Sequence, residues 1–181
     1  MSTSQVAQQA VKMPEGVSVK LEERTLTVKG KLGEAKKHFD KVGVNIGVEG
    51  DSVIISPFSK KKKDNVIINT VASLINNMIT GVTKGYTYKL KVVYAHFPIS
   101  VKVKGDEIHV ENFVGERSPR IAKIVGSCKA SVEGDDVIVK GVSLEDVGQT
   151  AANVELATKV KRKDSRIFLD GLYIYVKEVG L

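Results

Sequence analysis

The sequence predicts an α+β protein built by internal duplication, with two small domains that are each an antiparallel sheet packed by one helix. The phrase VEGDSVII at residues 48–55 returns as VEGDDVIV at residues 132–139. Alternation of apolar and polar residues, the period of strands, surrounds both copies, and helical spacing follows each of them. Two repeats are too few for a solenoid, so we expect two domains.

The first repeat opens with two predicted hairpins. GVSVKL (16–21) and TLTVKG (25–30) both alternate, and the polar EER between them is typical of a turn. The copy at 48–55 forms the second hairpin, with its turn at Gly50 and Asp51.

A helix and a strand complete the first repeat. Residues 64–79 carry apolar side chains at helical spacing, with Asp64 or Asn65 as the expected N-cap and Gly81 as the expected stop. Strand alternation returns in YTYKLKVVYA (86–95).

The second repeat follows the same order. ISVKV (99–103) and EIHVENF (107–113) correspond to the first hairpin, and CKASVEGDDVIVKG (128–141) corresponds to the second. Ser143, followed by Glu145 and Asp146, is typical of a helix start. The helix should present an apolar stripe made of Val147, Ala151, Val154 and Thr158. LYIYVK (172–177) matches the strand that ends the first repeat.

These repeats define the expected domains. Residues 1–13 are polar and read as a flexible N-terminal tail, residues 14–95 form the first repeat, and residues 96–181 form the second. The N-terminus lacks the apolar stretch of a signal peptide, and no 18 apolar residues run together. We therefore expect a soluble cytoplasmic protein that does not enter a membrane. The one cysteine, Cys128, is expected to be a small buried strand residue.

Nothing in the sequence predicts catalysis. His38, His96 and His109 stand apart, with no spacing typical of metal ligands. Neither a Gly-x-Ser-x-Gly motif nor a phosphate-binding Gly-rich loop is present. Asp135 and Asp136 fall at a hairpin turn, where Asp is favoured for local hydrogen bonds. An enzyme acting on nucleic acid would need a base or a metal cluster, so we expect no enzyme, no metal and no cofactor.

The positive charge favours a polyanionic partner. The net charge is +7, and it lies in the first half, which has 15 Lys and Arg against 8 Asp and Glu, whereas the second half has 13 of each. Within the second half, however, bases gather in RSPRIAKIVGSCK (117–129) and LATKVKRKDSR (156–166). A domain with segregated charge can bind phosphates despite a net charge of zero.

A second basic run precedes the first predicted helix at Lys60, Lys61, Lys62 and Lys63. Lysines there oppose the helix macrodipole. Two interpretations stay open for this secondary basic patch: a solvated loop, or contact with an anionic partner.

The tyrosines cluster in two predicted strands, where about half should face the cores. This argues against base stacking and for recognition of the backbone or shape of structured RNA.

Three segments and the duplicated frame around them resemble one known family. GVTKGYTYKLKVVYAHFPI, VENFVGERSPRIAKI and EDVGQTAANVELATKVKRKDSRIFLDGLYI are similar to the sixth protein of the large ribosomal subunit, called the ninth in eukaryotes. The resemblance covers nearly the whole chain after about Met13. RIFLDGLYIY stands where the bacterial branch has a basic, Gly-rich phrase, so the chain resembles the archaeal and eukaryotic branch.

The resemblance implies a structural, non-catalytic protein with two similar α+β domains. It implies binding to large-subunit ribosomal RNA near the sarcin-ricin loop and the stalk base, mainly through the second domain, with neighbouring ribosomal proteins as further partners and no small-molecule substrate. The RNA-contacting residues that it implies are Ser118, Arg120, Lys123, Gln149, Asn153, Lys159, Lys161, Arg162, Lys163 and Arg166. The alternative is a protein-interaction scaffold without direct RNA contact, whose charge serves solubility.

Overall fold

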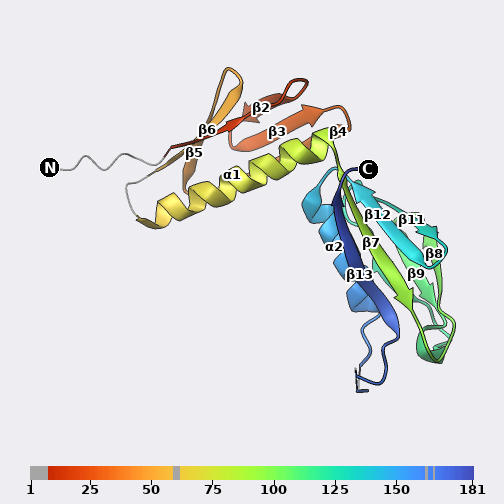
Figure 1. The fold of residues 1–181 in the computed structure, drawn as a ribbon. Coiled ribbons are helices and arrows are strands. Elements are labelled where there is room, and N and C mark those ends of the chain that lie inside the picture. Colours follow the sequence, from red (N-terminus) through yellow and green to blue (C-terminus); the bar gives the residue numbers. More distant parts are fainter. Residues whose placement is uncertain (1–7, 59–61, 162, 165) are drawn as a thin grey trace. The chain divides into compact units, whose positions relative to one another are not determined.

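The chain divides into two compact units, Met1–Thr83 (unit 1) and Lys84–Leu181 (unit 2). The computed structural model describes residues 8–58, 62–161, 163, 164 and 166–181 (Figure 1). Both units combine antiparallel sheets with one α-helix, which confirms the predicted α+β class and its duplication.

Unit 1 contains two three-stranded antiparallel sheets. One has the order β1 (Gln9–Lys12), β6 (Ser52–Pro57), β5 (Val44–Glu49), and the other has the order β2 (Ser18–Glu22), β3 (Thr25–Gly30), β4 (Gly33–His38). The predicted hairpins are confirmed, with the loop between β5 and β6 formed by Gly50, at φ +55°, and Asp51.

The strand β1 corrects the prediction of a flexible tail over residues 1–13. Gln9–Lys12 pairs with Ser52–Ile55 of β6, and Val11 is buried against the unit. The prediction failed because QAVK has only one strongly apolar residue and so shows no clear alternation. The strand forms because its backbone hydrogen-bonds to β6. Residues 1–7 lie outside the described part of the chain.

The helix α1 (Lys62–Thr83) begins before the predicted N-caps Asp64 and Asn65, and it continues past Gly81. Its last turn is closed by the Thr83 hydroxyl, which donates to the Ile79 and Thr80 carbonyls, and Gly85 (φ +80°) turns the chain after it. Tertiary packing explains the extension, because Ile79 and Val82 are buried.

One stretch of α1, Val66–Thr83, is long and apolar enough to cross a membrane by length and composition. Its apolar side has another use, because α1 contacts β1, β3 and β6. The helix side chains Ile68, Val71 and Ile75 are each at most 2% exposed. They form the core of unit 1 together with alternating residues of the strands, Leu26, Val28, Val53 and Ile55.

Unit 2 repeats this construction and adds one strand. A four-stranded antiparallel sheet has the order β11 (Lys129–Glu133), β12 (Asp136–Gly141), β7 (Tyr86–Val93), β13 (Gly171–Val179). A three-stranded antiparallel sheet has the order β10 (Arg120–Lys123), β9 (Glu107–Glu111), β8 (Ser100–Lys104), and the 3-10 turn η1 (Phe113–Gly115) follows β9. The helix α2 (Leu144–Ala157) contacts β7, β10, β12 and β13.

The strand β7 was predicted to end the first repeat, but it lies in unit 2. It pairs with β12 and β13, so it belongs to unit 2, and the division between compact units does not coincide with the repeat boundary expected near residue 95. In spatial order, β1-β6-β5 corresponds to β7-β12-β11. The segments 86–95 and 172–177, which match in sequence, are therefore neighbours in one sheet, and β13 has no counterpart among the described strands of unit 1.

The predicted start of α2 is confirmed. Ser143 is the N-cap, and its hydroxyl accepts a hydrogen bond of 3.3 Å from the Asp146 backbone N–H. Cys128 lies one residue before β11, so it is not a strand residue as predicted. It is half-buried rather than buried. Burial raises the pKa of its thiol to about 11, which makes it a poor nucleophile.

Candidate RNA-binding surface

A loop between α2 and β13 leaves the core of unit 2 and returns to it at the same point. The Leu172 backbone N–H donates to the Thr158 hydroxyl oxygen at 3.1 Å, and that hydroxyl donates to the Val154 carbonyl. Both residues are buried. We call the segment 159–169 the cationic loop, because its described residues include Lys159, Lys161, Lys163 and Arg166, all of them exposed.

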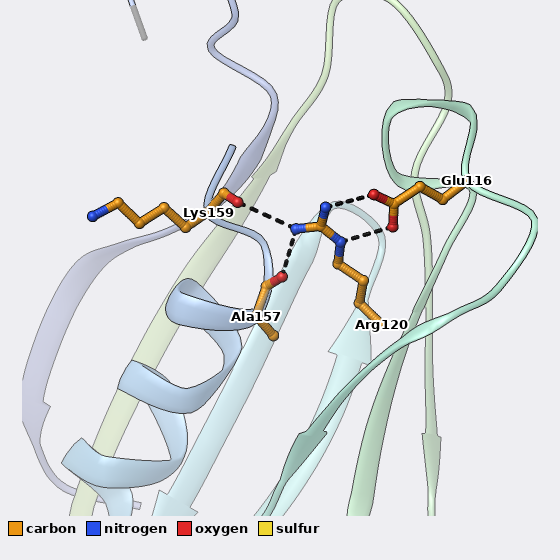
Figure 2. Close-up of polar contacts among 4 residues, drawn as sticks. All are labelled: Glu116, Arg120, Ala157 and Lys159. Carbon is orange, nitrogen blue, oxygen red and sulfur yellow. Dashed lines mark hydrogen bonds and ion pairs between the residues drawn. The ribbon is translucent and has the colours of Figure 1, made fainter. Parts of the chain in front are cut away.

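The first anchor of the cationic loop is Arg120 on β10 (Figure 2). Its Nη1 donates to the carbonyl oxygens of Ala157 at 2.9 Å and Lys159 at 3.2 Å. Its Nε and Nη2 donate to the two carboxylate oxygens of Glu116 at 2.8 and 2.6 Å, and these bonds lower the pKa of that carboxyl. The guanidinium carbon also lies 4.2 Å from the centre of the Phe113 ring.

Arg120 therefore joins three elements: η1, β10 and the end of α2. The helix C-terminus carries carbonyls without helical partners, and a cation there is favourable. Figure 2 shows that the Lys159 carbonyl faces the guanidinium, whereas the Lys159 side chain extends away from it. The sequence predicted Arg120 as an RNA contact, but in this structure its donors serve the protein itself.

The second anchor is Asp170, whose side chain lies at the other end of the loop and is almost fully buried. Its Oδ1 accepts from the Ala95 backbone N–H at 2.6 Å and the His96 backbone N–H at 3.3 Å, and its Oδ2 lies 2.7 Å from His96 Nδ1. Burial opposes ionisation, but these hydrogen bonds outweigh it and hold the pKa of Asp170 below its usual value.

The second anchor continues outward through aromatic contacts. The His96 ring stacks on Phe168 at 4.9 Å between centroids, and Lys163 Nζ lies 4.2 Å from the centre of the Phe168 ring on the loop itself. Arg166 forms an exposed local ion pair with Asp164, whose pKa it lowers. Lys163 is therefore oriented by packing, whereas the charge of Arg166 is partly compensated.

A polar row lies between α2 and β10. Gln149 Nε2 donates to Asn153 Oδ1 at 2.9 Å, and Asn153 Nδ2 donates to the Lys123 carbonyl at 3.0 Å. The Thr150 hydroxyl accepts from the Val125 backbone N–H nearby. The Lys123 and Gln149 side chains are exposed on this row, while Asn153 holds helix and strand together.

The structure thus brings Lys123, Gln149 and Asn153 together, and it places Lys159, Lys161, Lys163 and Arg166 on one loop. Ser118 is exposed in the turn before β10. Arg162, a predicted contact, lies outside the described residues, as do Lys60 and Lys61 of the secondary basic patch. Lys62 and Lys63 begin α1, and their side chains are not among those described.

Sequence reasoning missed the groups that hold this surface. Glu116 lies only four residues from Arg120, but Thr158 is 14 positions from Leu172, and no spacing motif links Asp170 with Ala95, 75 positions away. Arg120 and Ala157 are separated by 37 positions. Within the part of the chain that the structure describes, no group of three or more His, Cys, Asp and Glu residues is suited to hold a metal ion.

The fold and the surface define a class: a duplicated α+β protein that presents a buttressed cationic loop beside its second helix. A family model described as "Ribosomal protein L6" matches residues 13–85 and 97–171. The two matched segments correspond to the two repeats. The chain belongs to the ribosomal protein L6 family.

Archaeal relatives support this membership. The chain is 48% identical over 174 residues to the large ribosomal subunit protein uL6 of Ignicoccus hospitalis, covering 93% of this chain and 94% of that protein. It is 48% identical over 170 residues to uL6 of Aeropyrum pernix, covering 93% of each chain. It is 44% identical over 178 residues to uL6 of Methanobrevibacter smithii, covering 98% of this chain and all of that protein.

Proposed function

We infer that the protein is a structural constituent of the large ribosomal subunit and binds large-subunit ribosomal RNA through unit 2. The family membership supports the ribosomal role. The proposed place is near the sarcin-ricin loop and the stalk base, beside neighbouring ribosomal proteins, in the ribosome of the cytoplasm.

The observation that carries RNA binding is the anchoring of the cationic loop. Exposed lysines usually lose side-chain and loop entropy when they bind phosphates. Here the loop ends are joined through Thr158 and Leu172, and its two flanks are held by Arg120 and Asp170. The two ends of the loop are therefore held before binding, which reduces this cost.

The mechanism is neutralisation of phosphates by a shaped cationic surface. Lys159, Lys161 and Lys163 supply charge, while Lys123, Gln149 and Ser118 lie on the neighbouring row and turn, where they contact phosphate or sugar oxygens. Arg120 acts as a positioning residue beneath them. Phosphate contacts fix the register of the protein on folded RNA without reading its sequence.

The test is the salt dependence of binding to a large-subunit RNA fragment. Replacing Lys159, Lys161 and Lys163 by Ala should reduce the slope of log K against log salt by about 2–3, because each phosphate contact contributes about 0.9 or less. The matched control replaces Lys102, Lys104 and Lys140, which are exposed on other strands of unit 2. An unchanged slope in the loop variant, or an equal change in the control, would contradict the proposed surface.

A further inference from the structure

An apolar surface lies on and beside the cationic loop. Leu156, Ile167 and Tyr173 keep 62%, 66% and 42% of their surfaces exposed, and Leu169 is also exposed. They come from the end of α2, the loop and the start of β13. An exposed apolar patch on a protein surface marks a candidate interaction site.

Two of these residues, Leu156 and Tyr173, line a hollow of about 330 Å³ in unit 2, and its apolar lining also includes Val160 and Phe168. Glu155 and Lys159 lie on the same lining. This volume is at the small end of the range for ligand pockets, so the hollow fits one planar group rather than an extended chain.

Two rings are held at this hollow. Phe168 is fixed between His96 and Lys163, at 4.9 and 4.2 Å. The Tyr173 ring lies against Gly171, where an added Cβ would come within 3.2 Å of two ring carbons and the hydroxyl oxygen. Because Gly171 has no side chain, the Tyr173 ring can pack over it at the edge of the hollow.

Tyr86 is buried and Tyr88 packs on the core, whereas Tyr173 is exposed, so the strand tyrosines divide between core and surface as expected. Tyr173 and Tyr175 are both exposed because they alternate along β13 with the more buried Leu172, Ile174 and Val176. The rings that face the core cannot stack on bases, but the exposed ones can. Unit 2 offers an exposed ring at the place where its lysines gather.

We propose that this hollow receives one unstacked nucleobase of the RNA bound by the cationic loop. The proposal rests on the proposed function. Charge complementarity selects the occupant: Lys159 lies on the lining, and Lys161 and Lys163 lie in the adjoining loop, so an apolar group that enters here should be attached to phosphates. In a nucleic acid, the group with an apolar face is the base, and single-stranded bases are recognised by stacking on aromatic rings.

Glu155 adds a chemical preference. A carboxylate at the lining accepts a hydrogen bond from an exocyclic amino group, as in known Glu and Asp contacts to cytosine. Adenine, cytosine and guanine carry such a group and uracil does not. The hollow therefore favours one of those three bases over uracil.

The first experiment measures affinity of the full chain for a large-subunit RNA fragment as a function of salt. Tyr173→Ala should weaken binding roughly 5- to 150-fold, the range for one stacked base, with the salt slope unchanged. Tyr173→Phe, which keeps the ring, should bind as the parent does. Unchanged affinity in Tyr173→Ala overturns the base site, and loss of the slope together with affinity shows that the residue acts through the phosphates instead.

The second experiment identifies the occupant directly. A photoreactive phenylalanine analogue at position 156, which is exposed, should cross-link to one unpaired nucleotide in assembled large subunits. A cross-link to a ribosomal protein, or no cross-link at all, overturns the base site. The slope measured with the lysine variant still tests phosphate binding by the loop, so the failure of this inference is distinguishable from failure of the proposed function.

Discussion

In each unit an arginine donates hydrogen bonds to backbone carbonyls, but the two arginines differ in how many elements they connect. In unit 1, Arg24 donates to the carbonyls of Asp40, Val42 and Val44 at 2.8–3.3 Å, with the Phe58 ring 5.2 Å from its guanidinium carbon. In unit 2, Arg120 joins η1, β10 and α2. Arg24 thus fixes one short connection before β5, whereas Arg120 fixes the base of the cationic loop.

The second difference follows the helices. α1 has 22 residues and α2 has 14, and only α2 is followed by a return to its own sheet. That return creates both β13 and the cationic loop. The duplicated elements thus form the frame of both units, and the segment after the second helix forms the cationic surface of unit 2.

Removing the unit-2 arginine is expected to have the largest effect. Arg120→Ala should lower the free energy of unfolding of unit 2 by about 2–3 kcal/mol, because the carbonyls of Ala157 and Lys159 lose a charged donor. Backbone hydrogen exchange in α2 and β10 measures the loss. Arg24→Ala is the matched change, and its effect should stay in unit 1. Equal loss of protection in both units from either variant would contradict separate clamps.

The Asp170 anchor comes next. Asp170→Asn should cost about 1–3 kcal/mol, because a neutral amide replaces a carboxylate that accepts hydrogen bonds from Ala95 and His96. Urea unfolding of the full chain measures the cost. A variant as stable as the parent would show that the anchor contributes nothing to unit 2.

Acid should remove the same contribution. The folded pKa of Asp170 lies below its unfolded value of about 3.9, so the stabilisation is fully present above that value and is lost as pH falls through the folded pKa. Stability against pH should therefore be flatter in this range for Asp170→Asn than for the parent. Parallel curves would exclude a contribution from this carboxylate.

The helix cap of unit 2 has a smaller expected effect. Ser143→Ala should destabilise unit 2 by about 1 kcal/mol, because the Asp146 N–H loses its acceptor. Ser118→Ala, at an exposed serine outside any helix, is the control and should stay within about 0.5 kcal/mol of the parent. Thermal unfolding distinguishes the two, and equal midpoints would argue against the cap.

The smallest effect is a gain. Gly148 lies inside α2, and a Cβ there would meet nothing closer than Tyr88 at 3.9 Å. Gly148→Ala should therefore stabilise unit 2 by about 0.5–1 kcal/mol through lower backbone entropy of the unfolded chain. Urea unfolding would show a higher midpoint, and a lower one would mean that the helix has less room there than its contacts indicate.

Local signals explain which parts of the fold were predictable. Gly50 and Gly134 adopt positive φ at the two matching hairpins, and Ser143 caps α2, because each of these choices is decided by neighbouring residues. The strand character of Tyr86–Val93 was likewise clear. The strands that pair with it were not predictable, because alternation indicates a strand but does not say which strand lies beside it.

The candidate surface was predictable in its charges and not in its supports. The lysines stand close together in the sequence, so they could be read directly. Arg120 is basic too, and nothing local separates an arginine that faces RNA from one that binds carbonyls 37 positions away. The exposed side of Tyr173 follows from alternation with Leu172 and Ile174, whereas the hollow that it lines together with the end of α2 is not visible in the sequence pattern.

The most direct test of the central claim is ultraviolet cross-linking within assembled large subunits, with attachment sites read on both molecules. The account predicts attachments from unit 2 to ribosomal RNA at residues 156–173, around Lys159, Lys163 and Tyr173. Attachments to RNA confined to unit 1, or contacts of residues 156–173 with proteins alone, would contradict it.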